Sequence, residues 1–549
     1  MQQWALNFSC THRSIDGLLK LLHAHGHSEL PKTARTLLGT QRVTETLPVS
    51  GGHYYYIGFK ASLNKLVSHY PHIDIIRLVM NIDGLPISKS GSLSSSLRPV
   101  LCIVFDKPEF GVFPVALCVT SAKPSNLDFL TDTISEIKSM TDNGVMLNDT
   151  TIPVELFEVV CDAPAKAMCK STKSFSGYFG CDKCTIKGTY LNKFQKLTYP
   201  DVEGLQVRTD QQFRSQSNQE HHTGVSPFVS IPDLDMINAF PIDYMHQVLL
   251  GVQRRLLNIW VKEAKGRGRL PSQKITAVSE RLSKLAPNCP KELARKPRSL
   301  AHLANYKATE FRSFLLYTGK VVLCDFLSKE KYTHFLCLSV AITILLNTDL
   351  AKEYADYAHD LRVYFVTNVK PLYGEQHLVY NIHSLLHLSQ QTKIYGNLNL
   401  CSAFDFENHM KVYKKIIRQR KNPLVEIVRR LHELQSLELG EATSCKQPKL
   451  TCKPPDNMYI TTAGDIVELL QQRYITGDNG VVQRMYRCRK YFSKTDYFVN
   501  PCPSSIIGIY SIDPKSTGIC FIPAASVAHK CFKMVLDNLI VVQRLVHEL

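Results

Sequence analysis

Residues 73–83, IDIIRLVMNID, decide the fold of this 549-residue chain. Their short run of apolar and β-branched side chains predicts a strand. The sequence NIDGLP then places a glycine and a proline directly after Asp83, which ends the strand. Two similar runs follow, RPVLCIVFD from Arg98 and FGVFPVALCVT from Phe110. We therefore expect three consecutive strands, the first of which ends on a carboxylate.

A helix and a fourth strand continue this pattern. Residues 126–140, NLDFLTDTISEIKSM, have helical spacing, with Asn126 as the expected N-cap. Residues 153–165, PVELFEVVCDAPA, predict a strand that ends at Asp162. The order strand, strand, strand, helix, strand, with an acid closing the first and the fourth strand, is that of ribonuclease-H-like nucleases and transposases. We therefore expect an α/β fold with a ribonuclease-H-like core.

The remaining segments predict a larger organisation around this core. Two short helices are expected at Ser14–His25 and Lys32–Leu38, and short strands such as SIIGIYSID and TGICFIPA are expected near the C-terminus. Between them lies a mainly α-helical stretch that begins with a polar, loop-rich part. The expected parts are an N-terminal helical segment 1–70, a first core part 71–170, a helical insertion 171–394, the final core helices 395–435 and a small β-rich domain 455–549.

Net charge indicates the class of partner. The chain has 65 Lys and Arg residues against 48 Asp and Glu residues, a net charge of +17. Such an excess favours a polyanion partner, because cations that neutralise phosphates release counterions. A solvated basic surface without a nucleic-acid partner is the alternative.

Cysteine usage and the absence of targeting features indicate the compartment. The 17 cysteines lack the regular spacing of a disulfide framework, so we expect mostly unpaired thiols in a reducing environment. The N-terminal residues MQQWALNFSC do not resemble a signal peptide, and the longest apolar run, Phe335–Leu346, is too short to span a bilayer. We therefore expect a soluble, intracellular protein.

Acidic residues at strand ends are the first candidate site. Asp83 and Asp162 each close a strand, and carboxylates at the ends of neighbouring strands, joined by a third from a helix, hold a pair of divalent cations for phosphoryl transfer. The third candidate is Glu407, in SAFDFENHMKVYKKIIR, with Asp405 as the runner-up. The alternative is that these acids are ordinary turn residues.

The helix that begins near Glu407 continues with a run of cations suited to duplex phosphates, although a solvated helix face has the same composition. These cations are Lys411, Lys414, Lys415, Arg418, Arg420 and Lys421.

Two short motifs form a candidate zinc site. GYFGCDKC places Cys181 and Cys184 in a C-x-x-C pair, and NIHSLLHL places His383 and His387 four residues apart, on one face of a helix. Together they predict a Cys2His2 set. The alternative is buried thiols and hydrogen-bonded histidines, since an H-x-x-x-H pair also arises by chance, as at His23 and His27.

The motifs occur together and in a fixed order, which identifies a family resemblance. NIDGLP, CDAPA, GYFGCDKC, VRTDQQFR, DYMHQVLLGV, IHSLLHL, YGNL and FDFEN follow one another between about Leu6 and Arg430. This series resembles the core of CACTA (EnSpm)-type DDE DNA transposases. Its plan is also similar to that of the recombination-activating recombinase of vertebrate antigen-receptor assembly, in which a C-x-x-C follows the second Asp and a histidine pair precedes the final Glu.

The resemblance implies a site and a reaction. It implies Asp83, Asp162 and Glu407 as catalytic acids that hold two Mg²⁺ or Mn²⁺ ions, and its order favours Glu407 over Asp405. It also implies one structural Zn²⁺ on the Cys2His2 set. The expected activity is hydrolysis at transposon ends followed by transfer of the freed 3′-hydroxyl to target DNA, and His246 in DYMHQ belongs to the motif series without an assigned role.

The same resemblance implies double-stranded DNA as the partner, a homo-oligomer, no membrane association and a nuclear location. No separate zinc finger or helix-turn-helix is evident ahead of the core. Recognition of transposon ends is therefore left to one of four alternatives: the inserted helices, the C-terminal β-rich part, an accessory end-binding protein, or sequence missing from the gene model. Two alternatives are a domesticated, catalytically inactive DNA- or chromatin-binding protein and a zinc-stabilised interaction protein.

Overall fold

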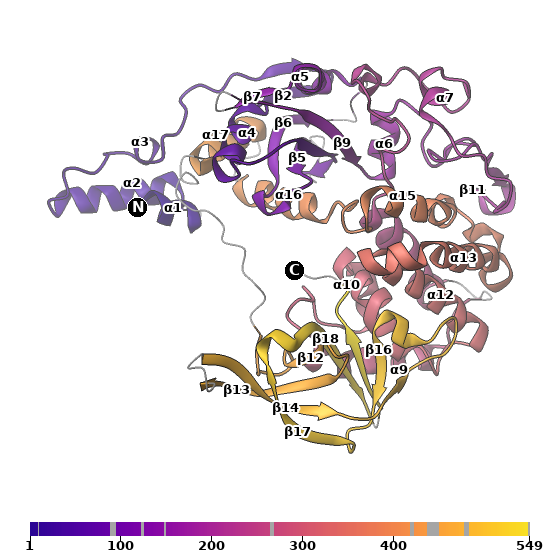
Figure 1. Ribbon diagram of the computed structural model, residues 1–549. Helices are drawn as coiled ribbons and strands as arrows, with labels where there is room; N and C mark the ends of the chain where they lie inside the picture. Colours follow the sequence, from indigo (N-terminus) through magenta and orange to yellow (C-terminus); the bar gives the residue numbers. More distant parts are fainter. Residues whose placement is uncertain are drawn as a thin grey trace. The chain divides into compact units, whose positions relative to one another are not determined.

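The computed structural model (Figure 1) has mixed α/β architecture and contains two units, defined by the contacts within each. Unit 1 comprises Met1–Ser174, Thr209–Pro241 and Ala403–Cys445, and unit 2 comprises Phe175–Arg208, Ile242–Ser402 and Lys446–Leu549. The structure describes the whole chain except residues 9, 88–94, 122, 123, 125, 148, 149, 264–267, 418–421, 436–449, 477–481, 538 and 547–549.

Unit 1 is built on a seven-stranded sheet whose centre is the set of strands predicted from sequence. These are β3 (Ile76–Ile82), β5 (Ser96–Val104), β6 (Phe113–Thr120) and β9 (Val154–Val160). The path through the sheet is β1-β2-β6-β5-β3-β9, and β4 (Leu85–Pro86) pairs with β5 outside this path. Strand β3 is antiparallel to β5 and parallel to β9.

The sheet continues past β6 into two strands that the sequence did not reveal. In the segment expected to be helical, α2 (His12–Ala24) and α3 (Ala34–Leu38) are present, but β1 (Leu47–Val49) and β2 (Gly52–Tyr56) follow them. Strand β2 pairs with β6. At Gly52 a Cβ atom would lie 1.9 Å from a backbone oxygen, so only glycine permits this close pairing.

Helices cover the sheet of unit 1. Helix α5 (Thr131–Asn143) buries Ile134 and Ile137 in the core and packs against β9. Asn126 is not its N-cap, because a 3₁₀ turn intervenes, and its side chain instead donates a hydrogen bond to Asp128. The other helices of unit 1 are α1 (Gln2–Asn7), α4 (Lys60–His69), α6 (Ala163–Cys169), α7 (Asp210–Arg214), α16 (Phe404–Ile416) and α17 (Pro423–Gln435). Of these, α17 packs on β2 and β6.

Part of the expected insertion belongs to unit 1. Thr209–Pro241 is grouped with this unit because apolar side chains such as Phe213, Phe228 and Phe240 join the core of the sheet. The backbone N–H of Val159 also donates to the Ala239 carbonyl at 2.7 Å. The loop-rich part of the sequence is therefore tied to β9 rather than to the helices that follow it.

The helical part of unit 2 is centred on α12 (Lys329–Leu345). Every residue from His334 to Leu345 is buried, which explains its apolar composition on all sides. Its principal neighbour is α13 (Thr348–Tyr373). The other helices are the π-helices Met245–Gln253 and Phe314–Thr318, α8 (Arg254–Val261), α9 (Ser272–Leu285), α10 (Ala308–Ser313), α11 (Gly319–Val322), α14 (Tyr380–His383) and α15 (Leu388–Tyr395).

The C-terminal part of unit 2 is a β half-barrel, which confirms the strands expected near the C-terminus. Its eight strands follow the order β15-β16-β19-β18-β12-β13-β14-β17. In that order they span Lys494–Asp496, Ile509–Ile512, Leu539–Arg544, Val527–Leu536, Met458–Thr461, Ile466–Thr476, Val482–Tyr491 and Thr517–Pro523. The Gln543 side chain donates to the Leu316 carbonyl at 2.7 Å, so the strands and helices of unit 2 share a polar contact inside the unit.

Two short hairpins complete the fold. Strands β7 (Val145–Leu147) and β8 (Thr150–Ile152) form one of them, and β10 (Thr189–Leu191) and β11 (Lys196–Thr198) form the other.

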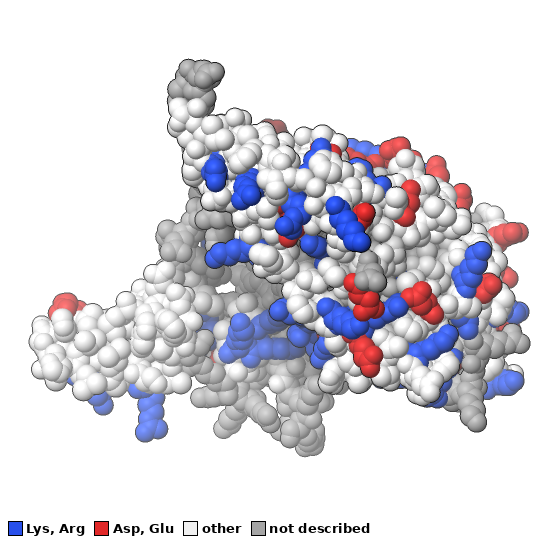
Figure 2. Space-filling view, turned by 90° about the horizontal axis from the view of Figure 1, so that it is seen from below, with Lys and Arg blue, Asp and Glu red and all other residues white. Residues whose placement is uncertain are grey.

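Surface charge and cysteines agree with the composition. On the face drawn in Figure 2, blue lysine and arginine side chains are more numerous than red acidic ones. All cysteines within the described residues are free thiols, which confirms the expectation for them. A search of the described helices finds none that is both long and apolar enough to cross a membrane.

Candidate metal centres

The Cys2His2 set predicted from sequence comes together inside unit 2. Cys181 and Cys184 lie in the loop that precedes the β10–β11 hairpin. His383 ends α14, and His387 ends the 3₁₀ turn Ser384–His387 that continues it. Cys181, Cys184 and His383 are buried, and His387 is half-buried. The four ligand atoms lie within 4.8 Å of one another.

The distances between these atoms fit a single tetrahedral metal ion. Cys184 Sγ lies 3.5 Å from Cys181 Sγ and 3.2 Å from His383 Nε2. His387 Nε2 lies 3.6 Å from Cys181 Sγ and 3.3 Å from His383 Nε2. Metal bonds of 2.0–2.3 Å give a tetrahedron with edges of about 3.3–3.8 Å. The residues are therefore compatible with a zinc site.

The two thiols are electrostatically unlike. Burial acts to raise the pKa of Cys181, but the hydrogen bond from Cys184 and the nearby histidines lower that pKa well below its usual value. The pKa of Cys184 is raised, because it donates to Cys181 and is itself buried. One sulfur is thus a ready thiolate, as metal ligation requires.

Several side chains that the sequence did not single out surround this set. Tyr199 stacks on the His383 ring with centroids 5.3 Å apart, and Arg208 Nε donates to the Cys181 carbonyl at 3.1 Å. The Tyr380 hydroxyl donates to Asp182 at 3.0 Å, and both residues are buried. Asp182 lies within CDKC and Tyr380 lies one helical turn before His383, so their positions within the motifs were the available signals.

The first two acids arise from equivalent positions on adjacent parallel strands. Asn81 on β3 is paired with Val160 on β9, and the Asn81 side chain donates to the Val160 carbonyl at 2.8 Å. Asp83 and Asp162 each follow two residues later. Both acids therefore leave the sheet at the same edge, as expected from the sequence.

Glu407 lies beside the first of these acids. It is in the first turn of α16, and its carboxylate is within 4.8 Å of the Asp83 carboxylate. The backbone N–H of Gly84 donates to Asp83 Oδ1 at 2.6 Å. Asp405, the runner-up, is exposed and is not part of this group of ligand atoms.

Asp162 is placed differently. Its Oδ1 accepts a hydrogen bond of 2.7 Å from the backbone N–H of Ala165, so Asp162 is the N-cap of α6. Among the described residues it is not in the group that contains Asp83 and Glu407. The structure thus brings two of the three predicted acids within metal-bridging distance.

The cations near these acids have separate roles. Burial lowers the pKa of the Arg98 guanidinium, while the charges of Cys118 and Asp83 act to raise it, so Arg98 is an electrostatic neighbour of Asp83. Lys411, Lys414 and Lys415 are exposed on α16. Arg418, Arg420 and Lys421, predicted with them as phosphate contacts, lie outside the described residues.

His246 is held by an acid of its own segment. Its Nδ1 lies 2.5 Å from Asp243 Oδ2, and the Asp243 carboxylate is buried. The backbone N–H groups of Met245 and His246 also donate to Asp243. The DYMHQ motif therefore begins the π-helix with an N-terminal cap that also fixes the imidazole.

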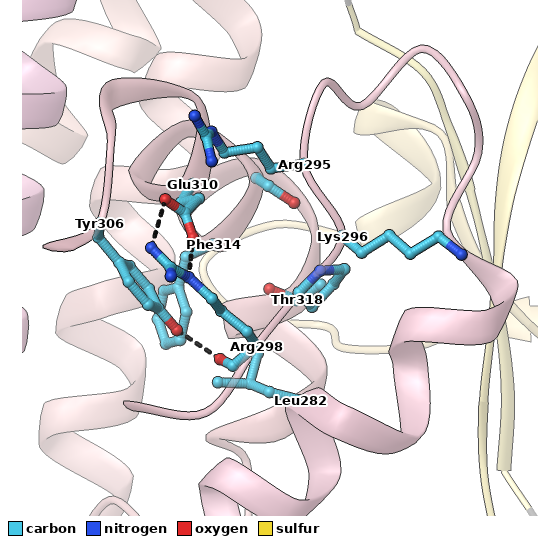
Figure 3. A pocket seen from close by; sticks show the side chains of 10 residues that line it. Leu282, Arg295, Lys296, Arg298, Tyr306, Glu310, Phe314 and Thr318 are labelled. Atoms are coloured by element: carbon cyan, nitrogen blue, oxygen red, sulfur yellow. Dashed lines mark hydrogen bonds and ion pairs between the residues drawn. The ribbon is translucent and has the colours of Figure 1, made fainter. Parts of the chain in front are cut away.

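A cavity elsewhere in unit 2 offers no room for a substrate (Figure 3). It has a volume of about 10 Å³, the size of a water molecule. The guanidinium of Arg298 is paired with Glu310 at 2.5 Å, and the Tyr306 hydroxyl donates to the Arg298 carbonyl. Arg298 and Glu310, two of its charged lining residues, are thus already paired with each other.

Comparison with known proteins identifies a similarity for the C-terminal part of the chain. Residues 426–545, which include most of α17 and all eight strands of the half-barrel, match the family model described as a domain of unknown function (DUF8592). No curated protein matches the chain.

Proposed function

We propose that this protein is a DDE-type DNA transposase of the CACTA (EnSpm) type. The observation that carries the proposal is that the carboxylates of Glu407 and Asp83, which are far apart in sequence, lie close together. They do so at the end of β3, and Asp162 follows the equivalent end of the neighbouring parallel strand β9. Carboxylates gathered at such an edge are the ligands that hard divalent cations require. The motif series described above supplies the family to which this geometry is compared.

The arrangement of the sheet supports a ribonuclease-H-like core. Strands β6, β5 and β3 are consecutive antiparallel neighbours, and β9 returns through α5 to lie parallel to β3. This agrees with the order expected for that fold. The zinc-ligand set and the helices of Ile242–Ser402 lie between β9 and α16 in sequence, which is consistent with a helical zinc-containing insertion.

The acids present fit a pair of Mg²⁺ or Mn²⁺ ions. Asp83 and Glu407 would share one ion between them, and Asp162 would hold the second through the carboxylate oxygen that does not cap α6. When bound, such a pair of ions activates the attacking water or 3′-hydroxyl and stabilises the leaving oxygen of a phosphodiester. The proposed reactions are hydrolysis at transposon ends and strand transfer to target DNA.

The chain's own side chains position this chemistry. The Gly84 N–H donates to Asp83 Oδ1 at 2.6 Å, which fixes the orientation of this carboxylate. The exposed lysines of α16, Lys411, Lys414 and Lys415, follow Glu407 directly and would contact DNA phosphates beside the acids.

Zinc would have a structural role. Four protein ligands leave no open coordination position, which is typical of structural rather than catalytic zinc. The ion would join the loop that holds Cys181 and Cys184 to the helical turn that holds His383 and His387. The partner of the proposed enzyme is double-stranded DNA, and synapsis of two transposon ends implies a homo-oligomer in the nucleus, with an accessory end-binding protein as a further partner.

Divalent-dependent nicking of a supercoiled plasmid that carries the cognate element tests the proposal. Wild type should nick in Mg²⁺ or Mn²⁺, and Glu407→Gln should not. Asp405→Asn is the matched control, because this exposed acid lies two residues away on the same helix. Nicking by Glu407→Gln, or its loss in Asp405→Asn alone, contradicts the assignment.

A second candidate function is a domesticated protein that binds DNA or chromatin without cutting it. The position of Asp162 favours this candidate, because it caps α6 and lies outside the group of ligand atoms that contains Asp83 and Glu407. Tight DNA binding by wild type without nicking under any divalent condition would establish it in place of the enzyme.

A further inference from the structure

Strands β13 and β14 form an antiparallel ribbon that extends beyond the rest of the half-barrel (Figure 1). Strand β12 pairs with β13 only as far as Glu468, and β17 pairs with β14 only from Met485 onward. The ribbon is defined by residues 471–476 and 482–487, which pair from Gln471–Arg487 to Thr476–Val482. All six residues of its first strand are exposed. On the second strand Val482, Gln483 and Arg487 are exposed, whereas Tyr486 is buried and residues 485–487 pair with β17.

The composition of the ribbon is selective. Its two strands, QQRYIT and VQRMYR, contain three arginines, three glutamines and two tyrosines but no acid. Tyr474 is 67% exposed and Val482 is 61% exposed. Large apolar side chains are seldom left in solvent on a free strand edge. The nearest acid along β13, Glu468, is already paired with Arg489 at 3.1 Å. The ribbon is thus positively charged throughout its described length.

Its arginines are positioned without being neutralised. The Arg473 guanidinium lies 5.8 Å from the centre of the Phe521 ring, and that of Arg484 lies 5.2 Å from the centre of the Tyr486 ring. Stacking of this kind orients a guanidinium and leaves its charge intact. Arg487, directly opposite Phe521 in the ladder, is exposed and forms no ion pair among the described residues.

We propose that this ribbon is a duplex-DNA-binding element that enters the major groove. Two strands about 4.8 Å apart, with their side chains, fit a groove about 12 Å wide. Arginine and glutamine are the side chains that contact phosphates and base edges there. The inference rests on the proposed function, because the DNA contacted would be the substrate of the acids in unit 1. It assigns a role to a part of the chain that matches only a domain of unknown function.

DNA binding by the full-length protein carrying Arg473→Gln and Arg487→Gln tests this inference. Affinity for a short duplex, measured by fluorescence anisotropy without Mg²⁺ or Mn²⁺, should fall about tenfold or more, and the slope of log affinity against log salt should become shallower by about 1.8. The matched control removes two exposed lysines from helices of the same unit, Lys329→Gln with Lys352→Gln, and should bind as wild type does. Zinc content and thermal melting should be unchanged in both double variants.

Three outcomes would overturn the inference. One is equal duplex affinity in the arginine variant and the lysine control. Another is a loss of single-strand binding with duplex binding unchanged, which would assign the ribbon to displaced strands. The third is a change of oligomeric state in sedimentation with DNA binding unchanged, which would assign the free strand edges to a second copy of this chain. The binding assay does not depend on cleavage, so the two proposals can fail separately. If the ribbon arginines are needed for duplex binding but the wild-type protein does not nick DNA in the plasmid assay, this inference is upheld and the proposed enzyme is refuted.

Discussion

The two candidate metal centres differ in how completely the protein assembles them. In unit 2, four ligand atoms lie at the edge lengths of a tetrahedron, and three of the four residues are buried. In unit 1, two half-buried carboxylates are close together while Asp162 caps a helix. The first centre is preformed and the second is partial.

The difference follows from the charges of the ligands. The Cys2His2 set carries little net charge in the absence of a metal ion, because only one of its two thiols has a lowered pKa, so ordinary packing can bring the ligands together inside a core. Carboxylates at the same place repel one another, and each lowers its own free energy by accepting hydrogen bonds or remaining hydrated. We infer that packing determines the geometry of the soft-ligand centre, whereas divalent ions would complete that of the acidic centre.

Cys184→Ser should be the variant with the largest effect on stability. A small effect would contradict the view that the Cys2His2 centre is the more completely assembled of the two. Loss of one thiolate removes a metal contribution on the order of 10 kcal/mol in structural zinc sites, so the variant should contain no zinc and unit 2 should unfold more readily. Metal analysis and thermal melting measure this. Cys337→Ser, at a buried thiol of α12, is the control and should retain zinc. Retention of zinc by Cys184→Ser would refute the Cys2His2 assignment.

Asp83→Asn tests the partial centre. The amide cannot share a cation with Glu407, so strand cleavage should fall by roughly 10²–10³-fold, the range seen when one charge-stabilising group is removed, while duplex affinity stays near that of wild type. Cleavage kinetics and anisotropy on the same preparations separate the two effects. Asp106→Asn, an exposed acid after β5 that pairs with Arg77, is the control. Unimpaired cutting by Asp83→Asn would remove this acid from the site.

His334 is a buried histidine of unit 2 that is not part of the Cys2His2 set, and it should make the stability of the protein depend on pH. Burial lowers its pKa to about 4, and its Nε2 donates to the Phe365 carbonyl at 2.8 Å. Because the folded pKa lies below the usual 6.5, this stability is present above pH 6.5 and is lost as the pH falls toward 4. The loss should be about 3 kcal/mol.

Urea unfolding across that pH range measures the effect. His334→Phe should show a weaker pH dependence than wild type, because it retains an aromatic ring against Phe365 but has no titrating group. An identical pH dependence in both proteins would contradict the assignment.

Tyr380→Phe should have the smallest effect and would sharpen the account of the preformed centre. Removing the hydroxyl that donates to Asp182 loosens the motif between the two cysteines, so zinc affinity should fall about tenfold while the fold is retained. Competition with a chelator measures this. Tyr332→Phe removes the hydroxyl of a half-buried tyrosine, which donates to a backbone carbonyl elsewhere in unit 2, and should leave zinc affinity unchanged. Equal affinities in both variants would show that Tyr380 does not support the site.

The sequence was most informative where one local pattern decides one element. The continuous apolar runs predicted β3, β5, β6 and β9 because strands buried on both faces need such residues. The sequence was least informative at β2, because its residues GHYYY do not form a continuous apolar run. This segment is a strand because Gly52 permits close pairing with β6. The expected cap at Asn126 was wrong because a 3₁₀ turn displaced the start of α5.

For the candidate sites, the sequence by itself determined which residue types were available and in what order. Cys181 with Cys184, His383 with His387, and strand-end acids are local patterns, and local geometry fixes the spacing within each of them.

Only the tertiary structure decided which patterns meet. It joined the two halves of the Cys2His2 set within unit 2, preferred Glu407 to Asp405 beside Asp83, and turned Asp162 toward α6. It also left the first strand of the β13–β14 ribbon exposed. The physical reason is that long-range proximity depends on the packing of the whole core and on the hydrogen bonds that each polar group finds there, and no short stretch of sequence contains either.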